Sequence, residues 1–154
     1  MGPVGFAPVA PGTWGALLGL IIGFLVLQSG LTTALILTVF AILIAHFACQ
    51  AYLQSDRGVD PSSIDPSEVI CDEVAGQMLA LFLVACFVPV SLTTLVVAFV
   101  LFRLFDILKP WPVNWAEGFE GAYGVMADDL VAGLMAGIGT VLISWALSGL
   151  GLSG

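Results

Sequence analysis

The sequence predicts an all-α, polytopic membrane protein, a bundle of about five transmembrane helices, and three observations carry that prediction. Hydrophobic residues make up 60% of the 154 residues and charged residues only 9%, whereas a soluble domain carries about 25% charged residues. The mean hydropathy is +1.12, and a soluble protein of this composition would expose large apolar patches. All charged residues lie between Asp56 and Asp129, in groups that long apolar runs separate.

Five apolar runs are long enough, or nearly so, to cross a hydrocarbon core, which takes about 20 helical residues. These runs are 14–27, 31–53, 74–88, 92–108 and 130–150. The short turns at 28–30 and 88–91 predict two antiparallel hairpins. The first and third runs are several residues short, so we expect their ends to dip below the interface or the bilayer to thin around them.

Five spans place every charged segment on the membrane side of the N-terminus and leave the C-terminus on the opposite side. All three basic residues share the charged side, which the positive-inside rule assigns to the cytoplasm. Three basic residues against eleven acids exclude a basic surface for nucleic acid. Prolines without a basic segment precede the first run, so we expect a retained span and not a cleaved signal peptide.

Small residues at four-residue spacing predict where helices approach closely. They occur in the first run (Gly15, Gly19 and Gly23) and in the fifth (Gly133 and Gly137). The three cysteines, at positions 49, 71 and 86, have no metal-ligand spacing, and we expect them to be packed apolar residues.

Three other side chains have a structural and a functional interpretation. His46, the only histidine, is expected to be packed and hydrogen-bonded, with a supporting role at a site as the alternative. Trp111 and Trp115 follow the fourth run and are expected to be interfacial anchors, with substrate contact as the alternative.

The last turns of the fourth run carry the first candidate site residues. Arg103, Asp106 and Lys109 are spaced three apart and therefore line one helix face, and Pro110 ends that helix. One carboxylate between two cations suits either a solvated helix end or a phosphate site. Because an unpaired cation is costly at depth, we expect Arg103 to hold Asp106 when the site is empty.

Acid pairs begin the third and fifth runs, where they can cap a helix and favour its dipole. The pairs are Asp72 with Glu73 and Asp128 with Asp129. Together with Asp106 they place five acids at converging helix ends, which repel one another unless a cation lies among them. Oxygen ligands without His or Cys favour Mg²⁺ or Mn²⁺. At the start of the first run, Thr13 is expected to be an N-cap beside backbone N–H groups that can bind an anion.

Four blocks carry a family resemblance. They are GFAPVAPGTWG at 5–15, DPSEVICDEVAG at 65–76, FRLFDILKPWP at 102–112 and GVMADDLVAG at 124–133. In this order they resemble the bacterial phosphatidylglycerophosphatase A family over nearly the whole chain. The resemblance implies one membrane-embedded phosphatase domain, 1–154, in the bacterial cytoplasmic (inner) membrane. It also implies Mg²⁺-dependent removal of the terminal phosphate of phosphatidylglycerophosphate, giving phosphatidylglycerol.

The resemblance implies an active site of seven charged residues: Asp72, Glu73, Arg103, Asp106, Lys109, Asp128 and Asp129. We expect the two acid pairs to supply the metal ligands. Arg103, Lys109 and Thr13 are expected to bind phosphate, and Asp106 to ligate metal or act as general base. The sequence contains neither Cys-x5-Arg nor DxDx(T/V), which favours metal-activated water. An aspartyl nucleophile, Asp106 or Asp129, remains the alternative.

Other function classes stay open at this point. A small membrane cation transporter could use the acids, although His46 is the only ionisable residue near a midplane. A membrane Mg²⁺-dependent phospholipid-metabolising transferase usually shows a longer Asp-rich helical motif. A scaffold without activity would gain nothing from five converging acids. The sequence is also compatible with a homo-oligomer.

Overall fold

The computed structural model describes residues 11–55, 66–117 and 122–151, which are helical apart from short turns. The helices are α1 (Pro11–Leu27), α2 (Leu31–Ser55), α3 (Pro66–Phe87), α4 (Leu92–Leu108), α5 (Val113–Glu117) and α6 (Ala122–Gly149). The all-α class is confirmed. By length and composition, α2, α3 and α6 could each cross a membrane, and α1 is a shorter apolar helix.

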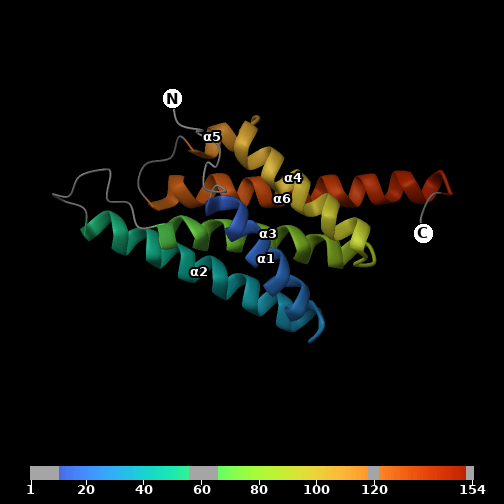
Figure 1. Cartoon of the computed structure of the whole chain (residues 1–154), viewed down its shortest axis with the longest axis horizontal. Helices are drawn as coiled ribbons and strands as arrows, with labels where there is room; N and C mark the ends of the chain where they lie inside the picture. The colour runs from blue at the N-terminus through green and yellow to red at the C-terminus, as the bar shows by residue number, and fades with distance from the viewer. Residues whose placement is uncertain (1–10, 56–65, 118–121, 152–154) are drawn as a thin grey trace, which may run out of the picture.

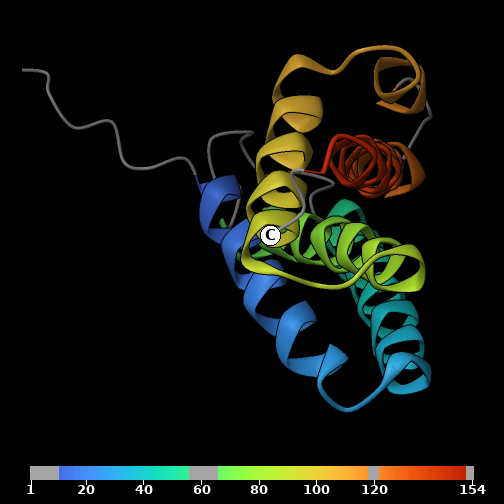
Figure 2. The ribbon, with the colours of Figure 1, turned by 90° about the vertical axis from the view of Figure 1, so that its right-hand side faces the viewer.

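Helix α3 lies at the centre of the bundle and contacts α1, α2, α4 and α6. The α1–α2 hairpin lies on one side of α3, and α4 and α6 lie on the other (Figures 1 and 2). Outward faces of the surrounding helices expose large apolar side chains, such as Ile36, Phe40 and Phe47 of α2. This distribution is that of a protein whose outer surface contacts lipid.

Both predicted hairpins are present. Gly30 closes the first turn with a φ of +105°, a conformation that glycine adopts without steric cost. A capping box starts α4: the Ser91 hydroxyl accepts a hydrogen bond from the Thr94 N–H, and the Ser91 N–H donates to Thr94 Oγ1 at 2.8 Å. These local signals reverse the chain twice and make each hairpin antiparallel.

Glycines mediate the two closest contacts of α3. On α1, a Cβ at Gly19 would lie 2.8 Å from the Val74 carbonyl oxygen, and one at Gly23 would lie 3.0 Å from Leu81. On α6, a Cβ at Gly133 would collide with the Gly76 carbonyl oxygen. The predicted small-residue contacts are therefore confirmed, and both depend on close backbone approach.

Three expectations about helix boundaries are wrong. Helices α3 and α6 begin at Pro66 and Ala122, so each acid pair lies well inside its helix. The pairs therefore neither cap a helix nor lie in its first turn, where the dipole acts. Helix α1 begins at Pro11, a residue suited to the first helical position, so Thr13 lies inside the first turn and is not the N-cap.

Candidate active site

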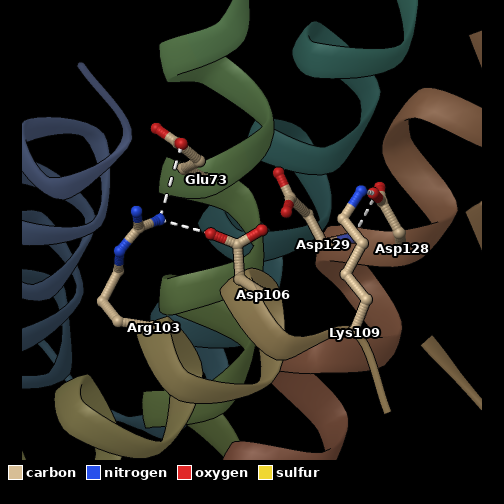
Figure 3. Close-up of polar contacts among 6 residues, drawn as sticks. All are labelled: Glu73, Arg103, Asp106, Lys109, Asp128 and Asp129. Carbon is tan, nitrogen blue, oxygen red and sulfur yellow. Dashed lines mark hydrogen bonds and ion pairs between the residues drawn. The ribbon is translucent and has the colours of Figure 1, made fainter. Parts of the chain in front are cut away.

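The seven charged residues of the predicted site come together at one end of the bundle. Helices α3 and α6 begin there, and α4 ends there (Figure 1). Six of the seven are drawn in Figure 3 and come from three helices. Glu73 extends from α3, and Asp128 and Asp129 extend from α6. The end of α4 carries Arg103, Asp106 and Lys109. Asp72, the seventh residue, precedes Glu73 on α3. The negative charge of Asp128 acts on Asp72, and that of Asp72 acts on Glu73. The folded chain thus brings together groups that lie up to 57 residues apart in the sequence.

Arg103 bridges two helices. Its Nη1 lies 3.6 Å from Oε1 of Glu73 on α3 and forms an ion pair with Asp106, one turn further along α4 (Figure 3). The Arg103 side chain is only 13% exposed, so the guanidinium is held between two carboxylates in a largely buried position. The predicted Arg103–Asp106 pair is confirmed, and the contact with Glu73 is new.

Lys109 bridges α4 to α6. Its Nζ lies 2.9 Å from Oδ2 of Asp128, while the other Asp128 oxygen accepts the backbone N–H of Asp129 at 2.9 Å. Lys109 is the left-handed C-cap of α4, with a φ of 44°, and its N–H donates to the Phe105 carbonyl. Glycine is the residue that usually takes this conformation, so the lysine at this position supplies a charge that glycine could not.

Two carboxyl groups face each other in the middle of the cluster. Those of Asp106 and Asp129 point toward one another (Figure 3), the negative charge of Asp106 acts on Asp129, and Asp129 is buried. Oε2 of Glu73, also buried, has no hydrogen-bond partner among the residues that the structure describes. Carboxylates this close repel one another unless a proton or a cation lies between them.

The carboxylate oxygens of this cluster are the kind of ligand that a hard divalent cation prefers. Among the described residues, no three His, Cys, Asp or Glu side chains are arranged to hold a metal ion jointly. Mg²⁺, however, commonly takes only one or two protein carboxylates and completes its shell with water and substrate phosphate. The facing pair of Asp106 and Asp129, with the unpartnered oxygen of Glu73 in the same cluster, meets that smaller requirement.

Sequence reasoning missed two neighbours of the acids. Cys49 of α2, expected to be inert packing, directs its thiol at both carboxylate oxygens of Asp72, 3.1 and 3.4 Å away. Gly12 of α1 lies against the Glu73 carboxylate and Arg103, because a Cβ there would collide with the first and lie 3.0 Å from the second. Contacts between residues so distant in the chain leave no periodic signal in the sequence.

The remaining candidates lie around this cluster. Thr13 follows Gly12 in the first turn of α1 and is partly buried. The ring of His46 stands edge-on to Phe47 at a centroid distance of 5.9 Å. Trp111 and Trp115 are 81% and 61% exposed, as expected of side chains that could anchor at an interface.

Comparisons with known proteins show what the chain is similar to. Residues 1–144 match the family described as Phosphatidylglycerophosphatase A. The phosphatidylglycerophosphatase A of Haemophilus influenzae is 37% identical over 129 residues, which are 82% of this chain and 74% of that protein. The protein of the same name from Escherichia coli is 31% identical over 133 residues, 85% of this chain and 72% of that protein.

A third relative carries a different name. A Bacteroides thetaiotaomicron protein named "Putative phosphatidylinositol-3-phosphatase" is 36% identical over 146 residues, 93% of this chain and 89% of that protein. No solved structure matches the chain. The family match, together with relatives above 30% identity that the chain largely covers, establishes that this chain belongs to the phosphatidylglycerophosphatase A family.

Proposed function

We propose that the chain hydrolyses the terminal phosphate monoester of phosphatidylglycerophosphate in a Mg²⁺-dependent reaction and releases phosphatidylglycerol. The observation that carries this proposal is the pairing of two cations with carboxylates from other helices, Arg103 with Glu73 and Lys109 with Asp128. Phosphoryl oxygens can replace carboxylate oxygens in such contacts, because both accept charge-assisted hydrogen bonds. The family match favours this function over the transporter and transferase alternatives.

The residues divide the work by their chemistry. The planar guanidinium of Arg103 can bind two phosphoryl oxygens, and Lys109 adds a compact charge beside them. Both cations would also stabilise the negative charge that grows on these oxygens in the transition state. Thr13 and the backbone of the first turn of α1, which lies against Glu73 and Arg103, could contribute further donors.

Hydrolysis then requires one proton acceptor and one attacking oxygen. In our proposal Asp129 or Asp106 takes a proton from water as the water oxygen forms a bond to phosphorus. The bond from phosphorus to the glycerol oxygen breaks, and that oxygen receives the proton that the carboxyl group took from water. Asp106 and Asp129 face each other (Figure 3), so either one can serve as this general base and then as the general acid.

Asp106 and Asp129 would hold the Mg²⁺ ion, with Glu73, Asp72 and Asp128 adding negative charge around it. The bound ion would polarise a phosphoryl oxygen and the attacking water. This assignment keeps the ligand role that the sequence analysis allowed for Asp106. It differs from the sequence expectation in giving no ligand role to Asp72 and Asp128, because Asp128 is already engaged by Lys109 and Asp72 by Cys49.

Attack by an aspartate is the competing mechanism. Asp106 or Asp129 would displace the glycerol oxygen and carry the phosphoryl group as an acyl phosphate, which water then hydrolyses. Phosphate label that stays on the protein after an acid quench would support this route, and its absence during steady turnover would support direct attack by water.

The membrane arrangement is part of the proposal. We place five spans, α1 to α4 and α6, across the inner membrane as a single domain, with the charged cluster at the cytoplasmic interface. The apolar helices support the membrane location, and the basic residues beside the acids support the cytoplasmic side. A phosphate monoester on a lipid headgroup would then meet Arg103 and Lys109 while its acyl chains stay in the bilayer.

The Bacteroides relative suggests a second candidate substrate, which should be compared directly with phosphatidylglycerophosphate. Its name assigns it the 3-phosphate of phosphatidylinositol, and the alignment covers more of this chain than either phosphatidylglycerophosphatase does. Both lipids present a phosphate monoester, so the cations of the site could bind either one. The choice depends on the alcohol that carries the phosphate.

The test measures phosphate release by the purified protein in detergent micelles from phosphatidylglycerophosphate and from phosphatidylinositol 3-phosphate. Each assay is run with Mg²⁺, with Mn²⁺ and with excess EDTA. We expect kcat/KM to be highest for phosphatidylglycerophosphate, activity to vanish with EDTA and activity to return with either metal. Full activity in EDTA would contradict the metal requirement, and a preference for the inositol lipid would reassign the substrate.

A further inference from the structure

The contact between Cys49 and Asp72 joins α2 to the charged cluster. Cys49 Sγ lies 3.1 Å from Oδ2 and 3.4 Å from Oδ1 of Asp72, within sulfur hydrogen-bonding range of both oxygens. The cysteine is 6% exposed and the aspartate 3% exposed, so this contact is shielded from water. A thiol is a weak donor, but a buried carboxylate gains from any donor that reaches it.

The surroundings of Asp72 make this donor important. Its carboxylate experiences the negative charge of Asp128 on α6 and lies beside Glu73 on its own helix. Arg103 and Lys109, the two cations of the cluster, contact Glu73, Asp106 and Asp128. Like charges would push the Asp72 side chain out of the cluster, and the thiol contact opposes that movement.

We propose that Cys49 is a positioning residue, which holds the Asp72 carboxylate in the acidic cluster and so makes α2 a functional part of the site. The inference rests on the proposed function, because it assumes that Asp72 contributes to the field that attracts Mg²⁺. Removing a group that orients a metal ligand typically changes metal affinity or activity by about 10- to 100-fold. Asp72 adds charge near the ion without binding it, so we expect an effect at the lower end of that range.

The experiment compares four proteins purified in detergent: the unchanged chain, Cys49→Ala, Cys49→Ser and Cys86→Ala. The alanine removes the donor, the serine keeps one, and Cys86 is an exposed cysteine at the far end of α3. Two quantities are measured against Mg²⁺ concentration, the rate of phosphatidylglycerophosphate hydrolysis and the thermal midpoint without substrate. The second quantity reports on binding of the ion without catalysis.

We expect Cys49→Ala to need about tenfold more Mg²⁺ for half its maximal effect on both quantities. KM for the lipid should change little, because the phosphate-binding cations are intact. Cys49→Ser should restore most of the Mg²⁺ response, and Cys86→Ala should match the unchanged chain. If Cys49→Ala does not accumulate as folded protein, Cys49→Val fills the space without supplying a donor and takes its place.

The outcomes separate this inference from the proposed function. An unchanged chain that fails to release phosphate from the lipid contradicts the proposed function. An active, Mg²⁺-responsive chain whose alanine variant responds identically overturns the role of Cys49 alone. Equal impairment of the alanine and serine variants would also overturn it, because the defect would then come from packing and not from the lost donor.

A double variant provides the final check. If Cys49 acts through Asp72, then Cys49→Ala should shift the Mg²⁺ response of the thermal midpoint in the unchanged chain but not in an Asp72→Asn background. An undiminished effect in that background would show that Cys49 acts on another group, and the inference would be wrong.

Discussion

Gly76 of α3 and Gly133 of α6 lie backbone against backbone, directly below the acidic cluster. A Cβ on Gly76 would come within 2.7 Å of the carbonyl oxygen of Asp129, and one on Gly133 would overlap the Gly76 carbonyl. Gly76 follows Glu73 by less than one turn, and Gly133 follows Asp129 by about one turn. The two glycines therefore set the distance between the helices that carry both acid pairs.

The first prediction tests this spacing. Gly133→Ala should lower the thermal midpoint, since inserting a methyl group into a tight contact costs about 1–3 kcal/mol, and Gly133→Leu should prevent assembly of the bundle. Gly149→Ala is the matched control in the same helix, because a Cβ there meets nothing within 4 Å. Thermal unfolding in detergent gives the midpoint of each variant. A midpoint of Gly133→Ala equal to that of Gly149→Ala would show that α3 and α6 accommodate the methyl group without loss of stability.

The second prediction separates chemistry from folding at Asp129. Asp129→Asn keeps the size of the side chain and removes its charge, so turnover should fall by about 10²- to 10⁴-fold through loss of a base or metal ligand. The thermal midpoint should not fall, because the variant keeps the packing of the side chain and removes its electrostatic repulsion from Asp106. Ser144→Ala, which removes an α6 hydroxyl bonded to Thr140, serves as the control. Near-normal turnover in Asp129→Asn would remove Asp129 from the site.

The third prediction concerns the two cations, which are not interchangeable. Arg103 contacts Glu73 and Asp106 and is 13% exposed, whereas Lys109 contacts Asp128 and is 31% exposed. Arg103→Lys loses the planar fork, so it should lower both the thermal midpoint and kcat/KM, by about tenfold or more for the latter. Lys109→Arg should mainly weaken turnover or substrate affinity. Equal, mild effects of the two swaps would show that both act only as diffuse positive charge.

The fourth prediction is a gain in stability. Gln77 is fully buried in α3, and within the described part of the chain neither polar atom of its amide has a hydrogen-bond partner. Because an unsatisfied buried group costs about 1–3 kcal/mol, Gln77→Met should raise the thermal midpoint. Thr140→Val is the comparison, since the Thr140 hydroxyl donates to Ala136 O at 2.7 Å and its loss should not stabilise. A lower midpoint for Gln77→Met would contradict the prediction.

The sequence predicted the apolar helices better than their polar ends. Helix α4 occupies the expected range on both sides, because Ser91 caps it and Pro110 follows it. Helices α3 and α6 begin eight residues before the expected apolar runs, because the acid pairs at 72–73 and 128–129 interrupt the apolar sequence and the expected runs began after them. Helix α5, with five residues, is too short to produce a periodic pattern.

The candidate site was predictable where its partners share a helix. The spacing of Arg103 and Asp106 alone indicated their ion pair, because residues three apart lie on one helix face. The contacts of Lys109 with Asp128 and of Cys49 with Asp72 depend on how separate helices pack, which composition and spacing do not determine. The family resemblance indicated which residues belong to the charged cluster, and the structure shows which of these residues contact one another.

The position of the acids inside α3 and α6 also determines how firmly their backbone is held. Asp72 and Asp128 each lie six residues beyond the start of their helix, which is about 9 Å along the axis. Helix ends fray, whereas residues more than one turn inside a helix have backbone hydrogen bonds on both sides. The carboxylates are therefore carried on rigid backbone before any cation or substrate arrives, and fraying of a helix end would leave them in place.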